Sequence, residues 1–147
     1  MTTSNREFAG RVAIVTGAGR NIGRAIALDL AAGGADVVVN ARQNKAEPDA
    51  VVGAIEANGG HALAVLADVT DAAAVARMAE AATQRFGRID FLVNNAAVRR
   101  ETSLDQMTLA EWREVLGMVL DGAFNCVKAC LPQLRASGPR RSSISED

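Results

Sequence analysis

The residues whose spacing points most directly to chemistry lie in the segment 15–27, which reads VTGAGRNIGRAIA. Its glycines, Gly17, Gly19 and Gly23, stand between an aliphatic run and a stretch with helical apolar period. Glycine accepts positive φ angles and lets a ligand approach the backbone, and the first N–H groups of a helix face an anion. The segment therefore predicts a strand-to-helix turn that holds a phosphate group; the same turn without a ligand is the alternative.

No metal site is expected from the remaining reactive side chains. Cys126 and Cys130 lie four residues apart on an expected helix, where free cysteines usually serve as small packing residues. His61 is the only histidine and opens an apolar segment, so we expect a strand or loop residue rather than a catalyst. Neither cysteine has a companion histidine at ligand spacing.

Four short aliphatic runs are expected to position the glycine turn, and three of them have nearly continuous apolar centres. Such runs are typical of strands covered on both faces, as in a parallel sheet. Helical segments alternate with them, which favours right-handed crossovers. We therefore predict an α/β fold with a doubly wound, Rossmann-like parallel sheet of strand order 3-2-1-4 and flanking helices, its strands within residues 11–17, 35–41, 61–68 and 89–95.

Capping residues mark the start of two expected helices. Thr70 or Asp71 can cap the helix that follows the third strand. Thr108 and Glu111 have capping-box spacing at the start of a longer helix. We expect this helix to run to about residue 134 and to bend near Pro132.

The glycine turn resembles the corresponding turn of the short-chain dehydrogenase/reductase family. Thr16, Gly17 and Gly23 match the family pattern TG-x-x-x-G-x-G, and Asn21 replaces its middle glycine. Asparagine tolerates left-handed backbone better than most residues, so this replacement is mild.

Two further segments resemble the family in its order along the chain. ADVTD contains Asp68 and Val69, which correspond to the family's adenine-contacting pair, and NNAA, residues 94–97, resembles its NNAG motif. The resemblance spans about residues 7–135, looks most like the 3-oxoacyl-acyl-carrier-protein-reductase-like group, and implies a dinucleotide-binding domain over residues 1–135. The cofactor site that we predict consists of Gly17, Gly19, Arg20, Asn21, Ile22, Gly23, Asn40, Arg42, Asp68, Val69, Asn94 and Ala96.

The residues after the second expected strand favour NADP(H) over NAD(H) as the cofactor. An NAD-specific site usually carries an acid there for the ribose 2′-hydroxyl, whereas this chain has Asn40, Ala41 and Arg42. Arg42, with Arg20 in the glycine turn, can hold a 2′-phosphate by charge-assisted hydrogen bonds. NAD(H) stays open as the alternative, because the arginines can be merely solvated and Asn40 can bind an unphosphorylated ribose.

The catalytic groups that the resemblance implies are missing from the sequence. The family transfers a hydride between nicotinamide and a carbonyl or alcohol carbon, with a Tyr-x-x-x-Lys pair, a serine and an asparagine on the fourth helix. This chain has no tyrosine. Its only lysines, Lys45 and Lys128, lie at other positions, Val119 aligns with the family's asparagine, and Asn125 should face elsewhere. We therefore predict no catalytic residue and no turnover by this chain alone; a non-catalytic nucleotide-binding or dimerising module is the alternative.

Charge and composition restrict the partners. The chain has 16 basic and 17 acidic residues without a basic patch, so nucleic acid is not an expected partner. No apolar segment approaches the roughly 20 residues that cross a bilayer, so we expect a cytoplasmic protein without a membrane segment. The resemblance implies homo-oligomers through the helix at about 108–134, and the open edge of the fourth strand is a second surface for association.

The segment 136–147, ASGPRRSSISED, interrupts the alternation of strands and helices. It has no apolar alternation, and we expect a disordered tail. When codons allowed for the residues after Gly138 are read from the third base of the proline codon, they permit Ala-Ala-Leu-Val-Asn-Ile-Gly-Gly, a family-like fifth strand. Our hypothesis is that the tail is a frameshift product, and the downstream DNA in the shifted frame should then encode Tyr-x-x-x-Lys.

Overall fold

Four parallel strands lie in the order β3-β2-β1-β4 in the computed structural model, which describes residues 5–138. Their bounds fall inside the predicted ranges: β1 (Val12–Val15), β2 (Asp36–Ala41), β3 (Ala62–Leu66) and β4 (Phe91–Val93). β1 pairs with both β2 and β4, with Ile14 opposite Val38 on one side and Leu92 on the other. The predicted strand order 3-2-1-4 is confirmed, with the first strand inside the sheet.

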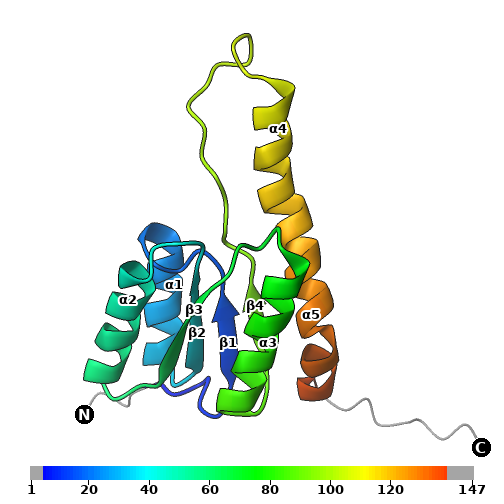
Figure 1. The fold of residues 1–147 in the computed structure, drawn as a ribbon. Helices are drawn as coiled ribbons and strands as arrows, with labels where there is room; N and C mark the ends of the chain where they lie inside the picture. The colour runs from blue at the N-terminus through cyan, green and yellow to red at the C-terminus, as the bar shows by residue number, and fades with distance from the viewer. Residues whose placement is uncertain (1–4, 139–147) are drawn as a thin grey trace, which may run out of the picture.

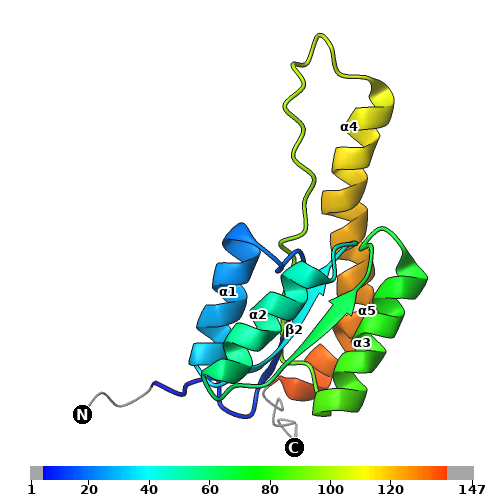
Figure 2. The same cartoon turned by 60° about the vertical axis from the view of Figure 1, so that its left-hand side comes forward.

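Helices cover both faces of the sheet (Figure 1, Figure 2). α1 (Asn21–Ala32) and α2 (Ala46–Ala57) lie on one face, and α3 (Ala72–Phe86) and α5 (Gly122–Ser137) lie on the other. The three layers form the doubly wound α/β fold that the sequence predicts.

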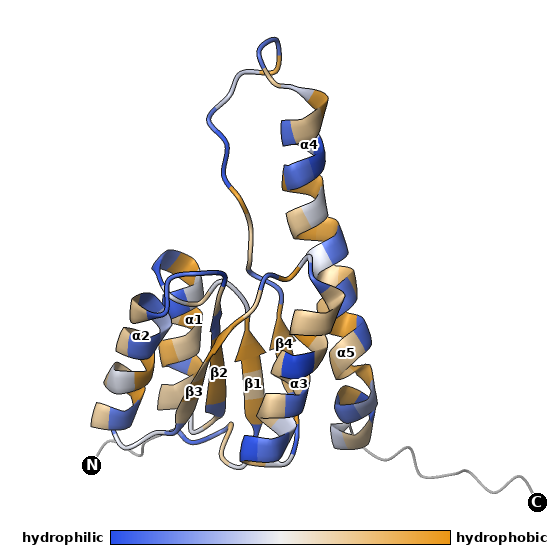
Figure 3. Ribbon diagram, in the orientation of Figure 1, coloured by the Kyte–Doolittle hydropathy of each residue, from blue (hydrophilic) through white to orange (hydrophobic). Residues whose placement is uncertain are grey.

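Alternate residues of the central strands supply two apolar cores. Val37 and Val39 pack on the side of α1 and α2, whereas Ile14 and Val38 pack on the side of α3 and α5, and all four are fully buried. Successive strand side chains point to opposite faces, so a continuous aliphatic run serves both cores. Figure 3 shows the strands coloured mainly as hydrophobic between helices of mixed character.

Asp71 caps α3, because its side chain accepts hydrogen bonds from two N–H groups of the first turn. Thr70, the other residue predicted for this cap, instead donates its hydroxyl hydrogen to Asp68 at 2.7 Å. The cap therefore belongs to the residue whose carboxylate lies at the helix start, while Thr70 and Asp68 form a separate turn after β3.

One long helix follows β4 and has three parts. α4 (Leu109–Leu116) begins with the predicted capping box of Thr108 and Glu111, the π-helical turn η1 (Gly117–Asp121) follows, and α5 completes the helix. The irregular turn thus lies at η1 rather than near Pro132, which α5 includes without interruption. Just after η1, a Cβ at Gly122 would lie 2.5 Å from Cγ2 of Val69, so the long helix packs closely against the segment after β3 at this point.

α4 extends beyond the carboxyl ends of the strands, beside the segment 94–107 (Figure 1). α4 has no buried residue, and Arg100 of the neighbouring segment pairs with Glu114. Large apolar side chains along the long helix are exposed, and we call their surface the α4–α5 face: Leu109, Trp112, Val119, Leu120, Phe124 and Val127.

The helix Leu109–Ser137 is long and apolar enough to cross a membrane, judged by length and composition alone. The expectation that no segment reaches this limit is therefore wrong, because a stretch of 18 residues within this helix contains at most two charged side chains. Cys126 and Cys130 are fully buried in one apolar cluster with residues of α3 and the strands, so one side of α5 packs on the domain.

The predicted tail, residues 136–147, begins inside α5, which ends at Ser137. The hydroxyl group of Ser137 lies 3.0 Å from the carbonyl oxygen of Ile89, to which it can donate, and this contact ties the helix end to the start of β4. The remainder of the predicted tail, residues 139–147, lies outside the described residues. The frameshift hypothesis concerns this segment and stays a prediction.

Candidate functional site

The carboxyl ends of the strands meet at one edge of the sheet and border a cavity of about 700 Å³. Doubly wound proteins bind their ligands at this edge. Asp68 lies beside the cavity through an ion pair with Arg42, and Asn94 lines a smaller cavity of about 120 Å³. All other predicted site residues line the larger cavity: Gly17, Gly19, Arg20, Asn21, Ile22, Gly23, Asn40, Arg42, Val69 and Ala96.

Two glycines let the turn after β1 pass close to the segment after β4. Gly17 has a φ angle of 60°, and a Cβ on it would lie 2.9 Å from the Cα of Ala96. A Cβ on Gly23 would lie 2.3 Å from the carbonyl oxygen of Gly17. Neither position accepts a larger side chain, so the glycine turn is a closely packed junction as well as a candidate cradle.

Asn40 supports this turn from the interior of the domain, and it is only 1% exposed. Its Oδ1 accepts a hydrogen bond from the N–H of Gly17 at 3.2 Å, and its main-chain carbonyl accepts one from the N–H of Ala18 at 2.8 Å. The side-chain amide donates to three carbonyl oxygens at 3.1 to 3.3 Å, those of Ala41, Val65 and Ala67. The predicted alternative in which Asn40 binds a ribose is therefore corrected: its N–H groups face interior carbonyls, and Asn40 positions the glycine turn.

The start of α1 offers N–H groups to an anion. Asn21 has a φ angle of 51°, the one positive value at a non-glycine position among residues 5–138, so it adopts a left-handed backbone, which asparagine tolerates better than most residues. Arg20, at the N-cap, makes no side-chain hydrogen bond to the helix. The first N–H groups of α1 belong to Asn21, Ile22 and Gly23, which line the larger cavity and have no acceptor within the helix. This cradle fits a pyrophosphate.

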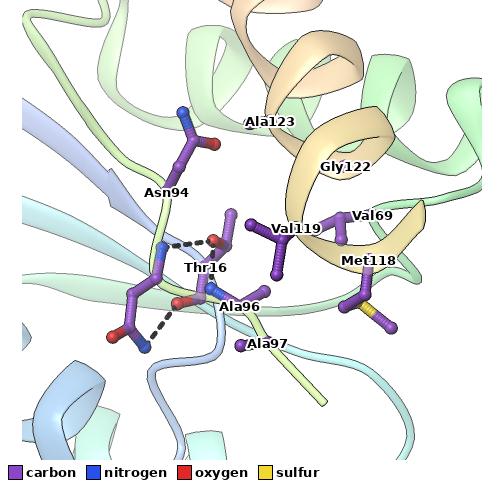
Figure 4. Close-up of a pocket in the computed structure, with 10 residues that line it drawn as sticks. Thr16, Val69, Asn94, Ala96, Ala97, Met118, Val119, Gly122 and Ala123 are labelled. Carbon is purple, nitrogen blue, oxygen red and sulfur yellow. Dashed lines mark hydrogen bonds between the residues drawn. The ribbon is translucent and has the colours of Figure 1, made fainter. Parts of the chain in front are cut away.

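Thr16 joins the glycine turn to the NNAA segment (Figure 4). Its hydroxyl oxygen accepts hydrogen bonds from the N–H groups of Asn95 and Ala96, each at 3.0 Å. The side-chain amide of Asn95 donates to the carbonyl oxygens of Thr16 and Gly17, each at 3.1 Å. Two motifs that lie far apart in the sequence therefore form one hydrogen-bonded unit.

Arg42 and Asp68 form an ion pair across the ends of β2 and β3, with Nε 3.0 Å from Oδ2. The other carboxylate oxygen accepts hydrogen bonds from the N–H and the hydroxyl of Thr70, at 2.9 and 2.7 Å. Partial burial acts to raise the pKa of Asp68, but the hydrogen bonds from Thr70 and the charge of Arg42 outweigh it and lower the pKa. Asp68 is thus ionised at neutral pH and orients Arg42, whose terminal nitrogens have no partner within residues 5–138.

The smaller cavity adjoins the larger one, and none of its lining residues carries an ionisable side chain. Figure 4 shows Val119 on the helix side of this cavity and Thr16 with Asn94 on the strand side. Val119 occupies the position at which the family resemblance placed an asparagine. Asn125 faces elsewhere, as expected, and its amide donates to the carbonyl oxygen of Val69 at 3.0 Å. The cavity therefore offers no side-chain acid or base for proton exchange with a substrate.

Cys126 and Cys130 are fully buried, which confirms their prediction as packing residues. Burial raises the pKa of their thiols, to about 11 for Cys126 and about 12 for Cys130. Both thiols stay protonated and are poor nucleophiles. Within residues 5–138, no group of three or more His, Cys, Asp or Glu side chains is placed to hold a metal ion.

Some residues that line the larger cavity were not predicted from the sequence. Glu47 reaches it from the first turn of α2, Arg99 from the segment after β4, and Met118 from η1. The only sequence signal for Glu47 was an acid at the start of the helix that follows Arg42. Its approach to the glycine turn depends on how α1 and α2 pack.

The fold and the site define a dinucleotide-binding domain of the doubly wound class. The sequence profile of the short chain dehydrogenases matches residues 11–143, and this chain belongs to that family. The match runs past residue 135, where the resemblance seen in the sequence ended. The described residues form the cofactor-binding region of a short-chain dehydrogenase of the 3-oxoacyl-acyl-carrier-protein-reductase-like group.

Individual relatives support the same assignment. A 3-oxoacyl-[acyl-carrier-protein] reductase of Synechocystis is 50% identical over 122 residues, which cover 83% of this chain and 49% of the relative. The reductase FabG of Staphylococcus aureus is 43% identical, with coverage of 83% and 50%. A short chain dehydrogenase from Burkholderia cenocepacia in complex with NADP has a TM-score of 0.82 at 38% identity, covering 86% of this chain and 52% of that one. The chain thus spans about half the length of the curated relatives it matches.

Proposed function

We propose that this chain supplies the cofactor-binding part of an oxidoreductase that transfers a hydride between NADP(H) and a carbonyl or alcohol carbon. The observation that carries the proposal is the larger cavity, in which the glycine turn and the N-terminus of α1 lie beside Arg20 and Arg42. The turn suits a pyrophosphate, and the guanidinium groups suit a phosphate on the ribose. When bound, the nicotinamide would donate the hydride to a carbonyl carbon or accept it from an alcohol carbon, while residues of this chain would hold the dinucleotide. A cytoplasmic location is part of this proposal.

The preference for NADP(H) over NAD(H) rests on the end of β2, where Ala41 and Arg42 replace the acid of an NAD-specific site. Asp68 holds the guanidinium of Arg42 through Nε, so the terminal nitrogens are available for a 2′-phosphate. Such preorganisation reduces the conformational entropy that binding costs. The relative from Burkholderia cenocepacia that carries NADP supports the same choice.

Fluorescence titration of the purified chain with NADPH and NADH tests this preference. Arg42→Ala is expected to weaken NADPH binding by about 10- to 150-fold, because a hydrogen bond to a charged group contributes roughly 1.5–3 kcal/mol, and to leave NADH binding nearly unchanged. Arg77→Ala removes an exposed arginine of α3 and is the matched control. Equal affinity of the wild-type chain for both nucleotides, or an unchanged preference in Arg42→Ala, contradicts the proposal.

The proposal includes the inactivity of this chain by itself. The sequence has no tyrosine, and the smaller cavity presents Val119 where the resemblance implies a relay asparagine. Positioned acids and bases typically accelerate such reactions by about 10² to 10⁴-fold. The chain therefore binds the dinucleotide without the group that exchanges a proton with the substrate oxygen.

A second copy of the chain is the partner that we propose for the α4–α5 face. Phe124 is 64% exposed and Trp112 is 47% exposed on this helix, and burial against the same face of another copy is favourable at about 25 cal/mol per Å². Light scattering after size-exclusion chromatography is expected to show a dimer that Phe124→Glu converts to a monomer. Leu104→Glu, which changes a residue as exposed but outside the helix, is the control. An unchanged dimer in Phe124→Glu argues against this partner surface.

A further inference from the structure

We propose that Glu47, in the first turn of α2, opposes the 2′-phosphate of NADP(H) and supports the free ribose hydroxyl of NAD(H). Glu47 would thereby reduce the preference for NADP(H) over NAD(H) that Arg20 and Arg42 confer. The inference rests on the proposed function, because it concerns a residue that faces the same dinucleotide.

Glu47 packs directly on the glycine turn. A Cβ at Gly19 would lie 2.9 Å from Cβ of Glu47 and 3.2 Å from its Oε2. The absence of a side chain at Gly19 is therefore what lets the first turn of α2 approach this closely. Glu47 lines the larger cavity together with Arg20 and Arg42, although it lies on a different element from either arginine.

The carboxylate of Glu47 is not neutralised by the protein. Within residues 5–138, no hydrogen bond or ion pair engages its side chain, and the basic residue nearest along the chain, Lys45, binds Asp49 at 2.8 Å. Arg42 binds Asp68 through Nε at 3.0 Å and forms no ion pair with Glu47. A ligand in the cavity therefore meets an unpaired carboxylate as well as the two arginines.

A carboxylate acts in opposite ways on the two cofactors. It accepts a hydrogen bond from a free ribose 2′-hydroxyl, which is the usual role of an acid in an NAD site. It repels a 2′-phosphate, which carries about −1.5 to −2 charge at neutral pH. In NAD-specific members of the doubly wound class the acid follows the second strand, whereas here α2 delivers it to the glycine turn. The arginines thus favour binding of NADP(H), whereas Glu47 favours binding of NAD(H).

Titrations of the full chain with NADPH and NADH separate these effects when wild type, Glu47→Gln and Glu56→Gln are compared. Glu47→Gln removes the charge and keeps the size, while Glu56→Gln makes the same change at the other end of α2. We expect Glu47→Gln to tighten NADPH binding at least about threefold, to leave NADH binding unchanged or weaker, and to lose this effect at high salt, as a screened Coulomb repulsion does. Glu56→Gln is expected to change neither affinity.

Adenosine 2′,5′-bisphosphate and 5′-AMP provide a second readout that is limited to the adenosine end. The gain in Glu47→Gln should appear with the bisphosphate and not with AMP. The informative case is a Glu47→Gln chain that binds nucleotide and melts like wild type. If its ratio of NADPH to NADH affinity is within twofold of the wild-type ratio, this inference is overturned and the proposed function is not. Failure of the wild-type chain to bind either dinucleotide overturns the proposed function and this inference with it.

Discussion

Asn40 provides the most direct test of how the glycine turn is held. Asn40→Ala removes the acceptor of the Gly17 N–H and the donor to three carbonyl oxygens in a side chain that is 1% exposed. Each buried polar group left without a partner costs about 1–3 kcal/mol, and Ala41 O keeps a second donor in the N–H of Ala67. We therefore expect Asn40→Ala to lower the free energy of unfolding by about 2–4 kcal/mol, a large part of the total stability of an ordinary domain.

Urea unfolding followed by circular dichroism measures this loss, and titration with NADPH shows whether the loosened turn also binds more weakly. Asn40→Asp is a stricter variant, since it keeps the acceptor for Gly17 but turns an oxygen toward the carbonyls, and it should destabilise at least as much. Asn58→Ala removes an exposed asparagine that makes one hydrogen bond and should cost about 0.5 kcal/mol. A loss below about 1 kcal/mol in Asn40→Ala would refute the assigned role, because the interior hydrogen bonds would then contribute no more than one exposed bond.

Other predictions concern strain, pH, chemistry and association. Asn21→Gly should keep or raise the melting temperature, whereas Asn21→Val should lower the stability by about 1–2 kcal/mol, because a β-branched residue is strained at positive φ. Burial acts to raise the pKa of Asp90, but hydrogen bonds from Arg88 and the N–H of Val12 lower it below its ordinary value. The contribution of Asp90 to stability is therefore complete above the unfolded-state pKa and is lost as the pH falls through the folded-state pKa. Between about pH 5 and pH 2, the Asp90→Asn variant should therefore lose less stability than the wild type does. The purified chain mixed with NADPH and a panel of ketones should oxidise no more cofactor than a control without protein; robust turnover by homogeneous chain contradicts the proposed inactivity. Within residues 5–138 one edge of β4 is unpaired, and it should cause concentration-dependent association that Phe91→Lys reduces; a monodisperse monomer at high concentration would count against this.

The local elements were predictable because their causes lie within a few residues. Aliphatic runs at the four strands, glycines at the turn and the capping pair Thr108 and Glu111 act through backbone preferences and neighbouring hydrogen bonds, and each appears where the sequence placed it. The left-handed backbone at Asn21 belongs to the same group, because only a few residue types adopt it. The alternation of strands and helices predicted a doubly wound sheet with right-handed crossovers, and the strand order 3-2-1-4 was taken from that class.

Tertiary packing alone decided which side chains work together at the cavity. Asn40 and Arg42 stand two residues apart in the sequence, and nothing in the sequence separates their roles. In the structure Asn40 lies within β2 and is buried, whereas Arg42 follows the end of β2 and lies at the rim, where Asp68 from the turn after β3 holds it. Glu47 enters the site because α2 packs on a glycine of a different element. The charge that a cofactor meets at the ribose thus depends on distances between elements, which no spacing along the chain encodes.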